Sequence, residues 1–290
     1  MNYVSPSFIE RVTNTTYPTT LLKRSSDLGL WSSIAKSVHE YKLLLGVQDG
    51  ELYYKLSEVD EIGNWKADIG ENFSLWRNHN CAITTIAVHK TTTLESRMTA
   101  EIAENLKEMI ENGCRKVWKV RLDYAQVQNV FLDDLLSLTS PEKICYEDFN
   151  REHLNSYVKR CINEGIKEFS GDISNNSDDL EKPLQRQLLN GSLQNLWLSV
   201  STEMEDLYRR MLQTIISVTK LHFCKGYQLI QYHFQFSDIV ESFMNTLVPF
   251  TKNGSKYYRH SSGCVFYFKC AKRWRDSFHL RYVVNTQMTF

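Results

Sequence analysis

The sequence predicts an α/β protein, an open solenoid in which a mostly parallel sheet carries its helices on one face. Two observations favour this fold class. An apolar-x-x-apolar-x-apolar spacing recurs along the chain, and stretches with the 3.6-residue period of amphipathic helices lie between its occurrences. The clearest occurrence is Leu193-x-x-Leu196-x-Leu198, the spacing with which a leucine-rich repeat enters its strand. We therefore expect a leucine-rich-repeat-like array of helix–strand units.

Three further stretches carry this strand-entry spacing, and they begin at Ile83, Val117 and Val218. Successive predicted strand centres are about 25–30 residues apart, near the leucine-rich range. They lie at Val120, Ile144, Glu168, Trp197 and His222. Alternating strands and helices at this period predict parallel strands joined by right-handed crossovers. No Gly-rich phosphate loop follows any of these strands, which favours a curved array over a doubly wound sheet.

The predicted helices have recognisable ends. Thr92-x-x-Glu95 is a capping box that should open one helix, and Asn112-Gly113 should end it. Pro183 suits a first helical position, and Gly191 can adopt the left-handed conformation that closes a helix. The side chains expected to point inward on the last two strands of the array are Leu196, Leu198, Leu221 and Phe223.

Two domains are expected, a small helical module at 1–40 and a repeat domain at 41–290. Ser5-Pro6 supplies an N-cap and a first-turn proline for the helical module. At the start of the repeat domain, Asp49-Gly50 separates two strand-like runs. Both residues tolerate positive φ, so this pair predicts a hairpin turn.

The composition excludes several classes of protein. The 290 residues carry no formal net charge, so the molecule as a whole has no bias towards nucleic acid or anionic lipid. No stretch approaches the roughly 18 apolar residues of a membrane span, and the amino-terminal residues do not resemble a signal peptide. The seven scattered cysteines fit a reducing compartment. We therefore expect a cytoplasmic or nuclear location and no membrane partner.

Motifs for catalysis and cofactor binding are absent from the sequence. It contains no dinucleotide-binding, Walker, zinc-protease or nucleophile-elbow motif. His222-x-Cys224, and His260-x-x-x-Cys264 with Cys270, could supply zinc ligands, but no second pair has the spacing of a known finger. The sequence therefore predicts a protein that is not an enzyme and that uses no cofactor and no metal.

A basic segment lies near the end of the chain, where aromatic residues alternate with Lys and Arg. Such a segment can bind single-stranded nucleic acid, by ion pairs with phosphates and by stacking on bases. Aromatic residues within a strand are more often part of a core, so a solvated basic rim is the favoured interpretation. The central basic residues are Lys269, Lys272, Arg273 and Arg275.

Three stretches resemble a known family, the F-box-like proteins expanded in nematodes, which carry a divergent leucine-rich-like region behind the F-box. The first is Val4-Ser-Pro6-x-Phe8-Ile9-x-x-Val12, which continues to Leu28-x-Leu-Trp31-x-x-Ile34-Ala35 and resembles a shortened F-box. The second is Leu44-Leu-Gly-Val-x-Asp-Gly-x-Leu-Tyr-Tyr54, and the third is Leu184-x-x-Gln187-Leu-Leu-Asn-x-x-Leu193-x-x-Leu196-x-Leu198.

This resemblance implies a non-catalytic substrate-recognition subunit of an SCF-type ubiquitin ligase, with an F-box-like module at 1–40. A Skp1-type adaptor would bind the module, and the repeats would hold an unknown protein target. The residues implied in adaptor binding are Pro6, Phe8, Ile9, Leu21, Leu22 and Trp31. Two alternatives stay open: a repeat-based interaction or regulatory protein without adaptor binding, and a nucleic-acid binder that uses the basic tail.

Overall fold

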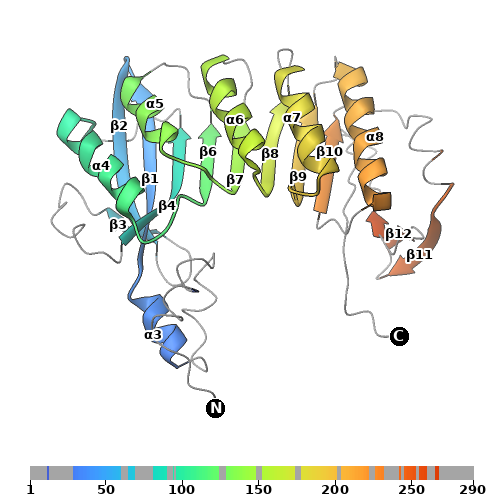
Figure 1. Ribbon diagram of the computed structural model, residues 1–290, viewed down its shortest axis with the longest axis horizontal. Coiled ribbons are helices and arrows are strands. Elements are labelled where there is room, and N and C mark those ends of the chain that lie inside the picture. The colour runs from blue at the N-terminus through green and yellow to red at the C-terminus, as the bar shows by residue number, and fades with distance from the viewer. Residues whose placement is uncertain are drawn as a thin grey trace. The chain divides into compact units, whose positions relative to one another are not determined.

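The computed structural model describes most of the chain between Gly29 and Tyr267 and divides it into two compact units, 1–141 and 142–290. The described residues are 12, 29–59, 65–68, 81–89, 94, 96–123, 129–147, 152–173, 178–200, 204–221, 226–231, 242, 245–252, 255–259 and 265–267. The protein is a mixed α/β protein with an open, mostly parallel sheet (Figure 1).

The first unit contains strands side by side in the order β6-β4-β1-β2-β3, and β5 pairs with β2. β1 is parallel to β4, and β4 to β6, whereas β2 is antiparallel to β1, β3 and β5. The strands are β1 (His39–Gln48), β2 (Glu51–Val59), β3 (Trp65–Asp68), β4 (Cys81–His89), β5 (Ser96–Arg97) and β6 (Lys119–Asp123).

The turn between β1 and β2 has the two-residue form that its sequence predicts. Gln48 pairs with Glu51, and Asp49 and Gly50 between them have φ angles of 52° and 83°. Positive φ at both central residues is the requirement of a type I′ turn, whose twist matches that of the flanking strands. The hairpin prediction is therefore confirmed.

Two helices, α4 (Ala100–Asn112) and α5 (Val130–Ser137), lie on one face of these strands (Figure 1). Helix α4 buries an apolar stripe that includes Ile102, Leu106 and Met109. Its predicted start is wrong. The side chain of Thr99 caps the helix and accepts a hydrogen bond from the backbone N of Ile102 at 3.2 Å.

The late start of α4 has a physical reason. Ser96 and Arg97 pair with β2 as strand β5, and the backbone N of Met98 donates to the carbonyl of Leu52 at 2.7 Å. These hydrogen bonds hold the backbone extended up to Met98. The helix therefore cannot begin at Thr92, although the Thr92-x-x-Glu95 pattern is a valid capping box in isolation.

From β7 to β10 the second unit alternates strand and helix, and these four strands are parallel in the order β7-β8-β9-β10. Each helix connects two neighbouring strands, and all three lie on one face of them (Figure 1). The elements are β7 (Lys143–Glu147), α6 (Glu152–Glu164), β8 (Glu168–Ile173), α7 (Asp178–Leu189), β9 (Asn195–Val200), α8 (Glu205–Leu221) and β10 (Gly226–Gln231).

Two predictions about the second unit are wrong in detail. The predicted strand entry at Val218 belongs to α8, which continues to Leu221, and β10 begins at Gly226. Apolar residues at positions i, i+3 and i+5 suit either a helix or a strand, so spacing alone did not distinguish the two. Pro183 lies inside α7 rather than at its start, because α7 begins at Asp178.

The described ends of the chain add a helix and a small sheet. Helix α3 (Leu30–Lys36) precedes β1. In the second unit, β11 (Val248–Lys252), β12 (Ser255–Arg259) and β13 (Val265–Tyr267) form an antiparallel sheet. Among the described helices, none combines the length and the apolar character needed to cross a membrane.

Candidate functional site

The strands of the second unit have a face that their helices do not cover. Along β9, Leu196 and Leu198 are buried towards the helices, as predicted, whereas the alternate residues Asn195 and Trp197 point to the opposite side. We call this opposite side of β7, β8 and β9 the open strand face. Neighbouring strands lie about 4.8 Å apart, so side chains on it form rows that cross the strands.

The first row is a polar ladder at the amino ends of three strands. Glu168 on β8 stands between Lys143 on β7 and Asn195 on β9. One carboxylate oxygen of Glu168 pairs with the Nζ of Lys143 at 2.6 Å, and the other accepts a hydrogen bond from the Nδ2 of Asn195 at 3.0 Å. These two contacts fix the positions of all three side chains.

The second row contains Cys145, Ser170 and Trp197. The indole of Trp197 is 53% exposed, although the residue sits on a strand whose alternate side chains are buried. Its neighbour on β8 is Ser170, whose side chain is too small to cover an indole ring. The open strand face therefore presents a large aromatic surface on a rigid backbone, beside an ordered polar ladder.

Sequence reasoning did not identify this site. The sequence pattern places Trp197 on a strand. Because Leu196 and Leu198 are expected to point inward, Trp197 is expected to point outward, but the pattern assigns no function to its indole. The partners of Trp197 in the row come from other strands, and only the register brings Ser170 and Cys145 beside it. The signal that could have found the site was a large aromatic residue at an outward position of a repeat strand.

Most residues predicted to bind a partner lie outside the described part of the chain. Trp31 is an exception, since it is half-buried in α3. The other adaptor-binding candidates, Pro6, Phe8, Ile9, Leu21 and Leu22, lie outside the described residues. So do the basic tail residues Lys269, Lys272, Arg273 and Arg275, and the zinc candidates His222, Cys224, His260, Cys264 and Cys270.

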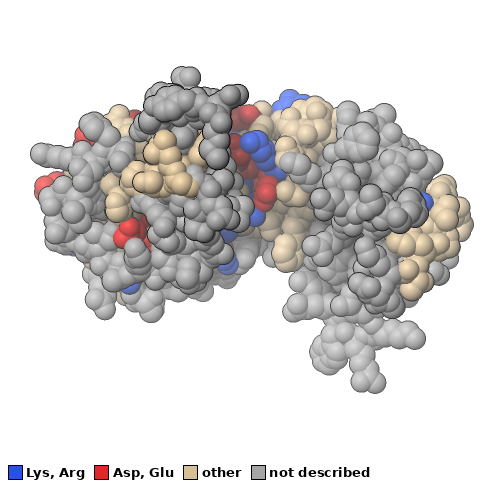
Figure 2. All heavy atoms as spheres, turned by 90° about the horizontal axis from the view of Figure 1, so that it is seen from below, with Lys and Arg blue, Asp and Glu red and all other residues tan. Residues whose placement is uncertain are grey.

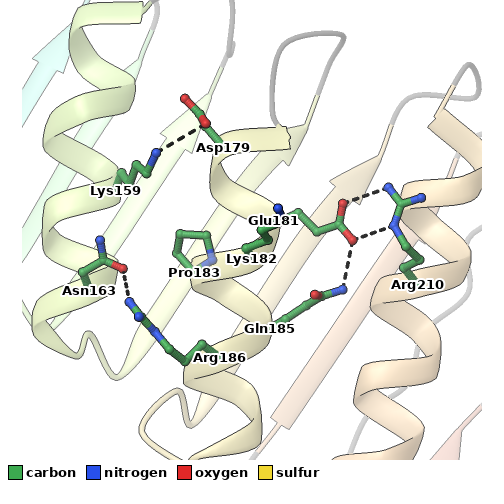
Figure 3. A pocket seen from close by; sticks show the side chains of 9 residues that line it. All are labelled: Lys159, Asn163, Asp179, Glu181, Lys182, Pro183, Gln185, Arg186 and Arg210. Atoms are coloured by element: carbon green, nitrogen blue, oxygen red, sulfur yellow. Dashed lines mark hydrogen bonds and ion pairs between the residues drawn. The ribbon is translucent and has the colours of Figure 1, made fainter.

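A groove of about 890 Å³ lies on the other side of the second unit, across α6, α7 and α8 (Figure 3). The Glu181 carboxylate is nine-tenths buried and accepts hydrogen bonds from Arg210 at 2.7 and 2.8 Å and from Gln185 at 2.9 Å. Lys159 pairs with Asp179 at 3.3 Å. The residues lining the groove are Lys159, Asn163, Asp179, Glu181, Lys182, Pro183, Gln185, Arg186 and Arg210.

The contacts in this groove connect neighbouring helices. Arg210 on α8 binds Glu181 on α7, while Arg186 on α7 donates to Asn163 on α6. A bidentate arginine–carboxylate pair with a buried carboxylate is a strong, geometrically specific contact. We therefore interpret the groove as a set of clamps that hold three helices together, and the open strand face is the better candidate site.

Charged side chains do not separate by sign on the surface seen in Figure 2, where described acidic and basic residues lie next to each other. The starts of β7 and β8 illustrate this mixing, since Lys143 pairs with Glu168 and Lys167 pairs with Glu142 at 2.8 Å. Within the described residues, no group of three His, Cys, Asp or Glu side chains could hold a metal ion.

Comparisons of this chain with known protein families, with curated proteins and with solved structures find no match.

Proposed function

We propose that this protein is a non-catalytic scaffold that holds a protein target on the open strand face of its second unit. The observation that carries the proposal is the exposed indole of Trp197 beside the ordered Lys143–Glu168–Asn195 ladder. Exposed tryptophans contribute a large share of the binding energy in protein interfaces. A rigid strand also costs little conformational entropy when a partner binds.

The architecture supports a repeat scaffold. From β7 to β10, strands that follow one another in sequence are also neighbours in space, and the helices that connect them lie on the same side (Figure 1). This arrangement supports a leucine-rich-repeat-like solenoid, in which each unit would contact mainly its neighbours. We propose that the elements from β7 to β10 are successive turns of such a solenoid.

The amino-terminal segment resembles a shortened F-box. This likeness favours docking of a Skp1-type adaptor, which would make the protein a substrate-recognition subunit of an SCF-type ubiquitin ligase. Holding target and adaptor on one chain raises the effective concentration of the target near the transferring enzyme. A scaffold that has lost adaptor binding is the second candidate, because it uses the same strand face.

Proximity capture with the full chain tests the target-binding proposal. We expect Trp197→Ser to lower recovery of a specific protein at least about tenfold, as loss of an interface tryptophan does. Lys182→Ser, at an exposed position on the helix side, is the control and should leave recovery unchanged. The captured protein is then purified, and its affinity for both variants is measured directly. Equal affinity for the wild type and Trp197→Ser would contradict the proposal.

A further inference from the structure

The groove on the helix side of the second unit is lined by more cations than carboxylates. Both carboxylates in its lining are engaged, since Asp179 pairs with Lys159 and Glu181 binds Arg210. These two contacts join α7 to α6 and to α8, so they fix the walls of the groove. They do not neutralise the two other basic residues that line it.

Those two residues are Lys182 and Arg186, both on α7 and both exposed. Among the described residues, neither has a carboxylate partner. The guanidinium of Arg186 donates to the amide oxygen of Asn163, which carries no charge. An arginine has five N–H donors in a fixed fork, so this one contact leaves donors of Arg186 available to a ligand.

Lys182 and Arg186 line the same part of the groove. They are four residues apart, so they lie on one face of α7, about one helical turn from each other. Asn163 stands opposite them on α6, where Arg186 holds it. Figure 3 shows the ring of Pro183 between this contact and the contact of Lys159 with α7. A proline ring is short, so no long side chain fills the groove at this point.

The groove has room for more than one small ion. Its volume of about 890 Å³ lies within the usual range for small-molecule sites, about 300–1,000 Å³. Asp179 precedes Arg186 by seven residues, which separates their backbones by about 10 Å along the helix. An anionic group next to Arg186 would therefore meet hydrogen-bond donors and stay away from the Asp179 carboxylate.

We propose that the groove binds a phosphate-bearing small molecule, with its phosphate between Lys182, Arg186 and the amide nitrogen of Asn163. The arginine fork matches two phosphate oxygens, and the lysine adds a point charge. The rest of the molecule would extend along Pro183 towards Asp179. This site lies on the opposite side of the second unit from the open strand face, and the inference does not rest on target binding there.

The test uses the full-length chain and inorganic pyrophosphate as the probe, with binding measured by titration calorimetry at low ionic strength. We expect saturable binding by the wild type and a loss of at least about tenfold in affinity for Lys182→Gln/Arg186→Gln, because charge-assisted contacts are removed. The control, Lys116→Gln/Lys167→Gln, loses the same charge from exposed positions outside the groove and should keep the wild-type affinity. Circular dichroism and melting temperature establish that both variants are folded.

Modification of arginines by phenylglyoxal, followed by mass spectrometry, gives a readout on the wild type that does not depend on how the variants fold. Saturating pyrophosphate should slow the modification of Arg186 at least about threefold, because only the unoccupied site reacts. Arg97, an exposed arginine in the first unit, should react at an unchanged rate. No saturable binding, an equal loss of affinity in the control variant, or unchanged modification of Arg186 would each overturn the proposal.

Discussion

Glu40 and Arg115 form an ion pair in the first unit from which water is almost excluded. The Nη1 of Arg115 lies 2.7 Å from the Oε1 of Glu40, and each side chain is 3% exposed. The pair joins β1 to the segment after α4, which are far apart in sequence. Desolvation offsets much of the attraction in such a pair, but removing one partner takes a close counter-charge away from the other, which stays buried.

We therefore predict that Glu40→Ala lowers the free energy of unfolding by about 3–5 kcal/mol, the usual result of breaking a buried pair. Urea denaturation followed by circular dichroism measures this loss. Glu164→Ala is the control, because it breaks the exposed Arg160–Glu164 pair at 3.3 Å and should cost about 0.5 kcal/mol or less. A loss below about 1 kcal/mol for Glu40→Ala would show that the buried pair is not structurally important.

The sequence could not reveal this pair or the other charged clusters. Glu40 and Arg115 are separated by 75 positions, and their contact follows from the way β1 and β4 pair. By contrast, the burial of Leu196 and Leu198 was predictable, because a period of two along a strand places alternate residues on one face. Local patterns determine which way a side chain points, but the register determines which side chains it meets.

At the scale of single elements, Thr99 and Thr92 are two competing caps for α4. The structure shows a hydrogen bond from the backbone N of Ile102 to the Oγ1 of Thr99, and Thr99 has the extended backbone of an N-cap, with φ −108° and ψ 165°. This hydrogen bond satisfies one of the backbone N–H groups that have no partner in the first helical turn.

Thr99→Ala is expected to lower the free energy of unfolding by about 1 kcal/mol, the usual value of a threonine N-cap. Thr92→Ala, which removes the cap that the sequence predicts, should cost less than about half of that. Thermal and urea unfolding of the two variants give the comparison. A larger loss for Thr92→Ala would mean that the helix begins where the capping box indicates, which would contradict the observed start at Ala100.

The lengths of elements were less predictable than their order. Three elements lie where the sequence patterns predict them, namely strand β7, strand β9 and the β1–β2 hairpin. Strong turn signals such as Asp49-Gly50 and Gly191 mark where such elements begin or end. The start of α4 was misplaced because β5 pairs with a strand more than 40 residues earlier in sequence. The end of α8 was misplaced because its apolar spacing also suits a strand.

At the scale of the whole molecule, the α/β class of the fold was predictable from the sequence. Stretches with the spacing of strands alternate along the chain with stretches that have the period of helices. Strands and helices alternate with a repeat of about 25–30 residues, and a crossover of this length returns the chain beside its previous strand. Strands that follow one another in sequence are therefore expected to be parallel neighbours in the sheet. The antiparallel β2, β3 and β5 at the start of the fold interrupt this rule. Only the hairpin turn at Asp49-Gly50 signalled that part of the arrangement in advance.

The amino-terminal segment distinguishes the two proposed functions, a ligase subunit that binds an adaptor and a scaffold that does not. If it docks an adaptor, some of Phe8, Leu22 and Trp31 must form an exposed apolar patch, which a soluble protein normally keeps for a partner. The full-length protein mixed with a purified Skp1-type adaptor should then give a stable complex on a sizing column. Phe8→Asp/Leu22→Asp should abolish the complex and leave the melting temperature nearly unchanged.

If the same segment instead covers the first unit, these side chains are buried, and the two aspartates destabilise the fold by several kcal/mol, as buried unpaired charges do. Wild-type protein that is folded but does not bind the adaptor, together with a variant that melts early, would rule out an F-box-like role. Trp197→Ser is the matched control, since it lies in the second unit and should preserve adaptor binding. The adaptor reading therefore requires loss of the complex with Phe8→Asp/Leu22→Asp, its retention with Trp197→Ser, and similar melting temperatures for both variants.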